Sequence, residues 1–105
     1  MSADRWIRGC VNGDGTIESG SGFTVLRTPP GRYEIRYASP FGGHPAVVVT
    51  QNYPGWNDFN VEGGDSRDNT VLIASDANRF KIKTGDGNGN AQDRNFSFIA
   101  IGPAD

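Results

Sequence analysis

The sequence predicts an all-β protein, an antiparallel, jelly-roll-like β-sandwich of seven to eight short strands. Polar and apolar residues alternate in two distant segments, RYEIRY at 32–37 and RFKIKT at 79–84, and a period of two is typical of strands with one buried face. Gly makes up 15 of the 105 residues, roughly double its usual 7% share. Gly or Pro also interrupts nearly every window with helical spacing, so turns between strands organise the chain.

The bulk properties predict one domain, 1–105, with a modest core, because only 35% of the residues are hydrophobic. The net charge is −2 and the Lys and Arg residues stand singly, whereas a nucleic-acid binder normally shows a basic patch. No apolar run reaches the ~18 residues that span a bilayer, and the N-terminal residues lack the apolar segment of a secretory signal. We therefore expect no nucleic-acid partner and no membrane insertion. Localisation stays open, including as part of a virion or an extracellular particle.

Turn residues separate the strands of the first half. Asn-Gly and Asp-Gly pairs at 12–15 favour the positive φ of a tight reversal, and Pro-Pro-Gly at 29–31 ends a later strand. In the segment 32–37 we expect Tyr33, Ile35 and Tyr37 to face the core. The predicted strands are Trp6–Val11, a short return that begins at Ile17, Phe23–Arg27 and Arg32–Tyr37.

The opposite side of the segment 32–37 carries a charged row, Arg32, Glu34 and Arg36. In a trimer, charges of both signs on one strand face can pair between subunits. On an exposed strand they are ordinary solubility residues that add little to stability. Both interpretations stay open at the level of the sequence.

Two strands of the second half are apolar along most of their length. The segment 46–50 reads AVVVT, and 96–101 is apolar apart from Ser97. Such runs are typical of strands covered on both faces, either inside the domain or by a neighbouring subunit. Because one small core does not easily cover two such strands, we expect part of this surface to meet another subunit. The predicted strands here are Ala46–Thr50, Thr70–Ser75, Arg79–Thr84 with Phe80 and Ile82 inward, and Phe96–Ile101.

The order of these features resembles a known family. Gly-Phe-Thr-Val is followed by Gly-x-Tyr-x-Ile-x-Tyr and Pro-Phe-x-x-x-Pro-x-Val-x-Val-Thr, and later by Arg-Phe-x-Ile-x-Thr and Phe-Ser-Phe-Ile-Ala-Ile-Gly. Over about residues 22–103 the chain is similar to small β-sandwich head modules of bacterial and phage fibre or collagen-like proteins. More loosely, it is similar to H-type lectin domains.

The resemblance implies a homotrimer that recognises carbohydrate or another surface ligand through its loops. We also expect no catalysis and no cofactor. The alternative is a purely structural trimerisation or capping domain that binds no small ligand. The N-terminal strand and hairpin, 1–21, either belongs to the sandwich or reaches a neighbouring subunit, and the adjacent Trp6 and Ile7 suit such a contact.

The loop NYPGWNDFN at 52–60 is the best candidate binding site. Aromatic faces stack on the apolar C–H side of sugars, Asn and Asp hydrogen-bond hydroxyls, and such groups favour loops on a rigid scaffold. The alternative is that the aromatic rings fold back over the end of the sandwich. The candidate contact residues are Tyr53, Trp56, Asn57 and Asp58.

A second loop copies the start of a calcium-binding motif. The residues DGNGN at 86–90 match D-x-[DN]-x-[DN], but Ala91 stands where the motif needs Gly, and Ser97 stands where it needs a bidentate Glu. We therefore expect a hairpin turn and no metal. A nearby acidic stretch, DSRD at 65–68, is expected to orient Arg67, to bind a cation or simply to be solvated. The weak candidate metal ligands are Asp86, Asn88, Asn90 and Asp93.

No motif in the sequence predicts an enzyme. His44 is the only His and Cys10 the only Cys, which is too few for a zinc site, and the chain has no Gly-x-Ser-x-Gly elbow. Glycoside hydrolysis needs two paired acids, and most of the acids of this sequence lie in predicted turns and not on strands. Cys10 shares its strand alternation with Trp6 and Arg8, and we expect it to be a small buried residue.

Overall fold

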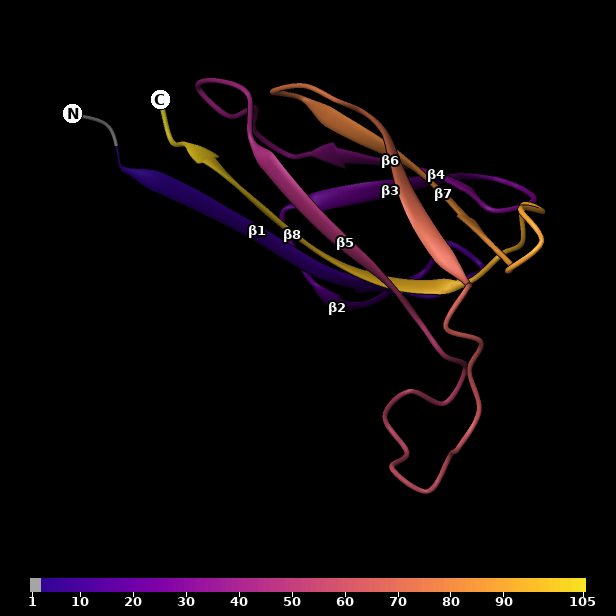
Figure 1. Ribbon diagram of the computed structural model, residues 1–105. Helices are drawn as coiled ribbons and strands as arrows, with labels where there is room; N and C mark the ends of the chain where they lie inside the picture. The colour runs from indigo at the N-terminus through magenta and orange to yellow at the C-terminus, as the bar shows by residue number, and fades with distance from the viewer. Residues whose placement is uncertain (1–2) are drawn as a thin grey trace.

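The computed structural model describes residues 3–105, and these residues form eight β-strands (Figure 1). Met1 and Ser2, which belong to the predicted segments 1–105 and 1–21, lie outside the described residues. The strands are β1 (Asp4–Val11), β2 (Ile17–Gly20), β3 (Phe23–Thr28), β4 (Arg32–Tyr37), β5 (Ala46–Asn52), β6 (Asn69–Ser75), β7 (Arg79–Gly85) and β8 (Asn95–Pro103).

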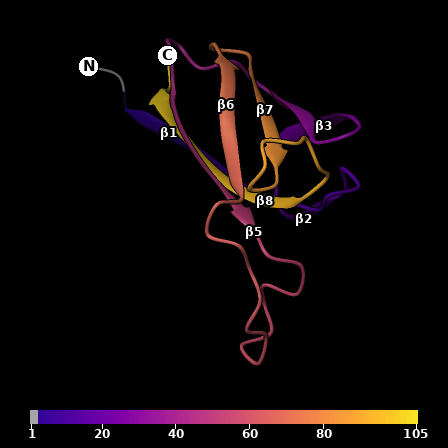
Figure 2. The same ribbon diagram turned by 45° about the vertical axis from the view of Figure 1, so that its right-hand side comes forward.

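Within residues 3–105 the strands form two four-stranded sheets, and the paired strands are antiparallel. Sheet one has the order β2-β1-β8-β5, and sheet two has the order β3-β4-β7-β6. The first and last strands pair along all of β1, from Asp4 opposite Pro103 to Val11 opposite Phe96. The predicted antiparallel β-sandwich is therefore confirmed, with eight strands, and its two layers are visible in Figures 1 and 2.

Aromatic rings fill much of the space between the sheets. The ring centroid of Phe98 lies 5.0 Å from that of Phe23 and 5.0 Å from that of Phe80, both in edge-to-face geometry, which adds to the gain from burial. The rings of Tyr33 and Phe96 make a further pair at 5.0 Å. The two predicted inward rows are confirmed, because all of their members are buried: Tyr33, Ile35, Tyr37, Phe80 and Ile82.

Tight turns form at the predicted Gly, Asn and Asp residues. The N–H of Gly15 donates to the carbonyl of Asn12 over 2.8 Å. Gly31 has a φ of 69°, and a Cβ built there would lie 2.6 Å from the carbonyl oxygen of Thr84. A side chain at position 31 would therefore be disfavoured both by the backbone conformation and by this contact.

The two apolar strands are not covered on both faces inside this chain, so that explanation of their composition is wrong. Val48 of β5 is 71% exposed and Ile99 of β8 is 45% exposed. They lie opposite each other on the outward side of sheet one. In a two-layer sandwich each sheet has only one face against the core, so every second residue points outward even when it is apolar.

Cys10 is half-buried, and the prediction that it is a buried core residue is wrong. It shares the outward side of β1 with Trp6 and Arg8, while Gly9 and Val11 face the core. A Cβ at Gly9 would lie 2.4 Å from Cζ of Phe23. The ring therefore occupies the place of a side chain at position 9, and a core-facing Gly of this kind gives no signal in the sequence.

Candidate functional site

Residues 53–68, between β5 and β6, project from the end of the sandwich as a long loop (Figures 1 and 2). We call this segment the projecting loop. Phe59 is 96% exposed, and Tyr53 and Trp56 are also exposed and lie outside the buried core. Tyr53 is 44% and Trp56 39% exposed, so both rings are partly covered while neither belongs to the core between the sheets.

Hydrogen bonds within the projecting loop define its shape. The N–H of Asp58 donates to the carbonyl of Gly55 over 2.9 Å, and the N–H of Asn60 donates to Oδ1 of Asp58 over 3.0 Å. Nearer the sheets, Nε and Nη2 of Arg67 donate to the carboxylate of Asp65 over 3.1 and 2.8 Å. The loop thus contains two local turns that present its other side chains to solvent.

Tyr53 packs against Gly63, across the projecting loop. A Cβ built on Gly63 would lie 2.0 Å from the hydroxyl oxygen of Tyr53, so any side chain at that position would displace the ring. The Gly63-Gly64 pair is therefore explained by close packing against Tyr53 and by the φ of 113° at Gly64.

A hollow of about 380 Å³ lies at the base of the projecting loop. Its lining includes the ring of Tyr53, the acids Asp65 and Asp68, and Arg94 from the connection between β7 and β8. One aromatic face beside several charged groups is a combination that can orient a ligand rich in hydroxyl groups.

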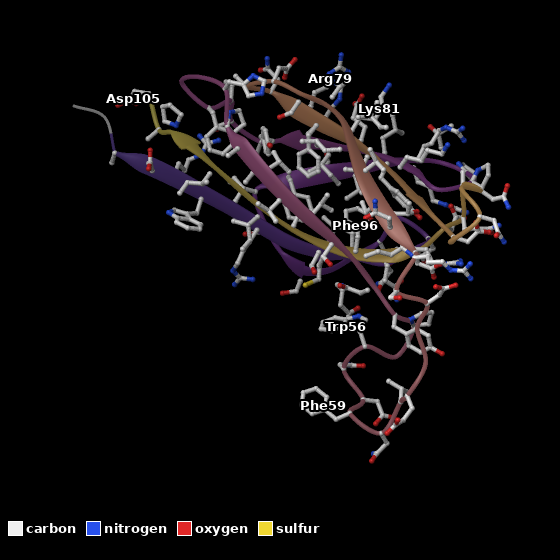
Figure 3. All side chains as sticks on the ribbon, in the orientation of Figure 1. Trp56, Phe59, Arg79, Lys81, Phe96 and Asp105 are labelled. Carbon is white, nitrogen blue, oxygen red and sulfur yellow. The ribbon has the colours of Figure 1, made fainter. Side chains whose placement is uncertain are left out.

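The four predicted contact residues do not form one group. Tyr53 lines the hollow, whereas Trp56, Asn57 and Asp58 are not among its lining residues. Trp56 lies further along the loop, and in Figure 3 its side chain is nearer the sandwich than that of Phe59, which extends from the outer part of the loop. The Asp58 carboxylate accepts hydrogen bonds within its own turn, and Asn57 is exposed.

The contact residues predicted from the sequence leave out two members of this region, Phe59 and Arg94. Phe59 could have been found, because it stands beside Asn and Asp in the same way as Trp56 does. Arg94 could not, because it reaches the hollow from a connection that lies far from the loop in the sequence. Only the folded chain brings Arg94 beside Tyr53.

The projecting loop is acidic, with four carboxylates against the single cation Arg67. The hydrogen bonds from Arg67 lower the pKa of Asp65 to about 2, and the same pair raises the pKa of Arg67. Both groups therefore stay charged over the physiological pH range. This geometry agrees with the interpretation that the acidic stretch 65–68 orients Arg67.

The segment 86–90, which resembles the start of a calcium-binding motif, folds as a turn that is stabilised by hydrogen bonds to its own Asp86. Oδ1 of Asp86 accepts the backbone N–H groups of Asn88 and Asn90 over 2.9 and 3.0 Å. The bond from Asn90 is the main cause that lowers the pKa of Asp86. Within residues 3–105, no group of three or more His, Cys, Asp or Glu is placed to hold a metal ion.

Asp93, the fourth weak metal candidate, instead joins distant parts of the backbone. Its carboxylate pairs with Arg27 and accepts the N–H of Gly31 over 2.7 Å. Tyr33 donates its hydroxyl to the carbonyl of Gly13 over 2.7 Å. The bond from Arg27 is the main cause that lowers the pKa of Asp93, while burial raises the pKa of Tyr33 to about 12. We interpret this network as structural.

A second kind of surface lies on the outward side of sheet one. The register places Trp6 and Ala46 on either side of Ile101, and Val48 opposite Ile99. A shallow hollow of about 260 Å³ lies beside Val48 and Ile99. We call these five residues the apolar face: Trp6, Ala46, Val48, Ile99 and Ile101.

Comparisons with models of protein families, with curated proteins and with solved structures found no match. Among the residues described, 3–105, there is no helix long and apolar enough to cross a bilayer. The molecule is therefore characterised by its geometry alone, as two four-stranded antiparallel sheets packed as a β-sandwich with a projecting loop.

Proposed function

We propose that the protein is a non-catalytic recognition module that binds carbohydrate or another surface ligand through the projecting loop. In this respect it is similar to fibre-head and lectin-like domains. The observation that carries the proposal is that three large aromatic residues, Tyr53, Trp56 and Phe59, are exposed on one loop that leaves the sandwich. Soluble proteins rarely expose neighbouring large apolar side chains without an interaction to serve.

The chemistry of the projecting loop suits a sugar. The ring of Trp56 would stack on the C–H side of a pyranose, and exposed Asn57 and Asp58 would bind its hydroxyls. In the hollow at the base, Tyr53 offers a second ring, and Asp65 and Arg94 offer charged hydrogen-bonding groups. Such a site orients its ligand with a few polar groups around an aromatic surface.

The partner of the apolar face is a second copy of this chain, and the proposed assembly is a homotrimer. Trp6 is 63% exposed and Val48 71% exposed, and contiguous apolar surface of this kind is typical of protein contacts. Three copies that meet through sheet one would hide these side chains and leave the projecting loop free.

Binding by the loop is tested on an array of glycans with the parent chain and Trp56→Ala. We expect Trp56→Ala to weaken binding at least about tenfold, as the truncation of aromatic hot spots does. Leu26→Ala is the matched control, because Leu26 is 60% exposed and lies on sheet two. If Trp56→Ala binds every ligand found as well as the parent does, the assignment of this site is wrong.

The second candidate function is purely structural, as a trimerisation or capping domain, and the apolar face is the observation that favours it. Light scattering at micromolar concentration should give a mass near three times 11.3 kDa, and Val48→Asp should return the chain to the monomer mass. A trimer that binds no glycan would favour the structural function. A monomeric parent chain would contradict both forms of the trimer proposal.

A further inference from the structure

The pairing of β4 with β7 gathers cations that stand singly in the sequence. Both strands alternate, so their charged residues turn away from the core, and Arg79 and Lys81 point away from the sandwich in Figure 3. We call the six charged residues of these two strands the basic face. The register sets them opposite one another in three pairs: Arg32 with Lys83, Glu34 with Lys81, and Arg36 with Arg79.

The charge of the molecule is divided unevenly between the basic face and the remainder. The basic face holds five of the chain's ten Lys and Arg and one of its twelve Asp and Glu, a formal charge of +4. The remainder has five cations and eleven acids, a formal charge of −6. A chain whose net charge is −2 therefore presents one strongly positive sheet face, and a field of this kind attracts anionic ligands.

Two of the three pairs set a cation against a cation. Arg32 lies opposite Lys83 and Arg36 lies opposite Arg79, an arrangement that destabilises a sheet. Glu34 relieves it in part, because its carboxylate accepts Nε of Arg36 over 2.6 Å and Nη1 of Arg79 over 2.9 Å. Within residues 3–105, the side chains of Lys81 and Lys83 take part in none of the ion pairs. The fold itself therefore leaves most of this positive charge unneutralised.

The arginines of the basic face keep donors for a ligand. The side chains of Arg36 and Arg79 are 58% and 49% exposed, and each uses one of its five N–H groups on Glu34. A hollow of about 190 Å³ opens beside Arg79 and Lys81. Two acids, Glu34 and Asp76, also line this hollow. The carboxylate of Asp76 accepts the backbone N–H groups of Asn78 and Arg79. The guanidinium groups can therefore make paired hydrogen bonds to a carboxylate or a sulfate.

We propose that the basic face binds a linear polysaccharide that carries carboxylate or sulfate groups, at a site separate from the projecting loop. Neighbouring strands lie ~4.8 Å apart, and residues on one side of a strand recur every ~6.8 Å. The cations thus form a regular grid on one side of the sheet, along which one extended anionic chain can lie. This inference does not depend on the proposed function of the loop.

A nucleic acid fits this surface less well. In the described part of sheet two the outward residues include no aromatic ring, and single-stranded nucleic acids bind largely by stacking on such rings. The major groove of a duplex admits a helix or a two-stranded ribbon, whereas the basic face lies on the central strands of a four-stranded sheet. The residues outside the basic face carry a formal charge of −6. They repel a wide polyanion such as a nucleic-acid duplex more than they repel a single polysaccharide chain that stays on the basic face.

The test compares polysaccharides that share one backbone: dextran sulfate, carboxymethyl dextran and neutral dextran, each titrated calorimetrically into the full chain at low salt. We expect both charged polymers to bind, the neutral one not to bind, and added salt to weaken binding. Lys81→Gln should weaken binding about three- to fivefold, which corresponds to the loss of one exposed ion pair. The Lys81→Gln/Lys83→Gln double variant should weaken it about tenfold or more.

Ser19→Asp is the matched control, because it makes the same change in net charge on exposed β2 of the other sheet. We expect it to bind within about twofold of the parent, since screening limits the reach of an exposed charge. Equal losses in Ser19→Asp and Lys81→Gln would overturn the proposal. So would equal binding of neutral dextran, tighter binding of a DNA duplex, or no binding of either charged polymer. Trp56→Ala should retain this binding. A loss of binding as large as that in Lys81→Gln would contradict the proposal that the basic face and the projecting loop are separate sites.

Discussion

The outward sides of the two sheets differ far more than their inward sides do. Inward, both sheets contribute aromatic and aliphatic side chains to one shared core. Outward, sheet one carries the apolar face, while the two central strands of sheet two carry the basic face between exposed Leu26 and Val71 on the edge strands. Strand alternation turns every second residue outward whatever its polarity. The core therefore constrains the inward rows, and the outward rows are free to differ according to what each side meets.

The largest expected effect contrasts two neighbours on β8. Phe98 is 3% exposed and packs on Phe23 and Phe80, so Phe98→Ala should lower the free energy of unfolding by about 3–5 kcal/mol. Ile99 is 45% exposed, and Ile99→Ala should cost less than about 1 kcal/mol. Urea denaturation at submicromolar protein concentration measures both. Losses of similar size would mean that the outward side of sheet one belongs to the chain's own core.

The inward rows could be predicted from the sequence, and the exposure of the outward rows could not. Tyr33, Ile35 and Tyr37 alternate with charged residues, so the buried side of β4 is unambiguous. Val48 and Ile99 stand among other apolar residues, so the sequence does not distinguish these outward positions from their inward neighbours. Their exposure follows from the two-layer architecture, which leaves one side of each sheet uncovered.

A smaller effect is expected from the one acid of the basic face. Hydrogen bonding from Arg36, followed by the charge of Arg79, holds the pKa of Glu34 below its ordinary value of 4.5. The folded-state pKa is thus lowered, so the stabilisation is fully present above the unfolded-state pKa and is lost as the pH falls through the folded-state value. Glu34→Gln should lower the free energy of unfolding by about 0.5–1 kcal/mol at pH 7, and this loss should shrink as the pH falls through the folded-state pKa of Glu34.

Glu62→Gln is the matched control for this pH dependence. Glu62 lies on the projecting loop and is exposed, and it takes part in none of the ion pairs formed by residues 3–105. Its substitution should leave the free energy of unfolding unchanged across the same pH range, as measured by urea titrations at pH 3, 5 and 7. The same pH-dependent loss in both variants would show that Glu34 does not stabilise the basic face.

The candidate sites were predictable only in part, for the same physical reason. The sequence places Trp56 in a loop among Gly, Pro, Asn and Asp, but it leaves open whether the ring is exposed or folds back over the end of the sandwich. The basic face needs the register between β4 and β7, which sets Arg36 opposite Arg79. Each strand shows its own outward charges, but only the pairing of the strands turns scattered cations into one surface.

The smallest expected effect is a gain in stability. Lys83 lies opposite Arg32, so Lys83→Gln should raise the free energy of unfolding by about 0.2–0.5 kcal/mol through the loss of a like-charge pair. Arg8 lies opposite Ile99 on sheet one, and Arg8→Gln should give no such gain. Urea midpoints at low and high salt measure both, and the gain should disappear at high salt.

A less stable Lys83→Gln variant would show that the lysine makes a favourable contact within the fold, and the two outward sides would then differ less than proposed. Higher stability together with weaker binding of dextran sulfate would show that Lys83 serves the ligand and not the fold. Residues kept for a partner are those whose replacement stabilises the free protein and weakens the complex. That pattern at Lys83, and its absence at Arg8, would separate a binding surface from ordinary surface charge.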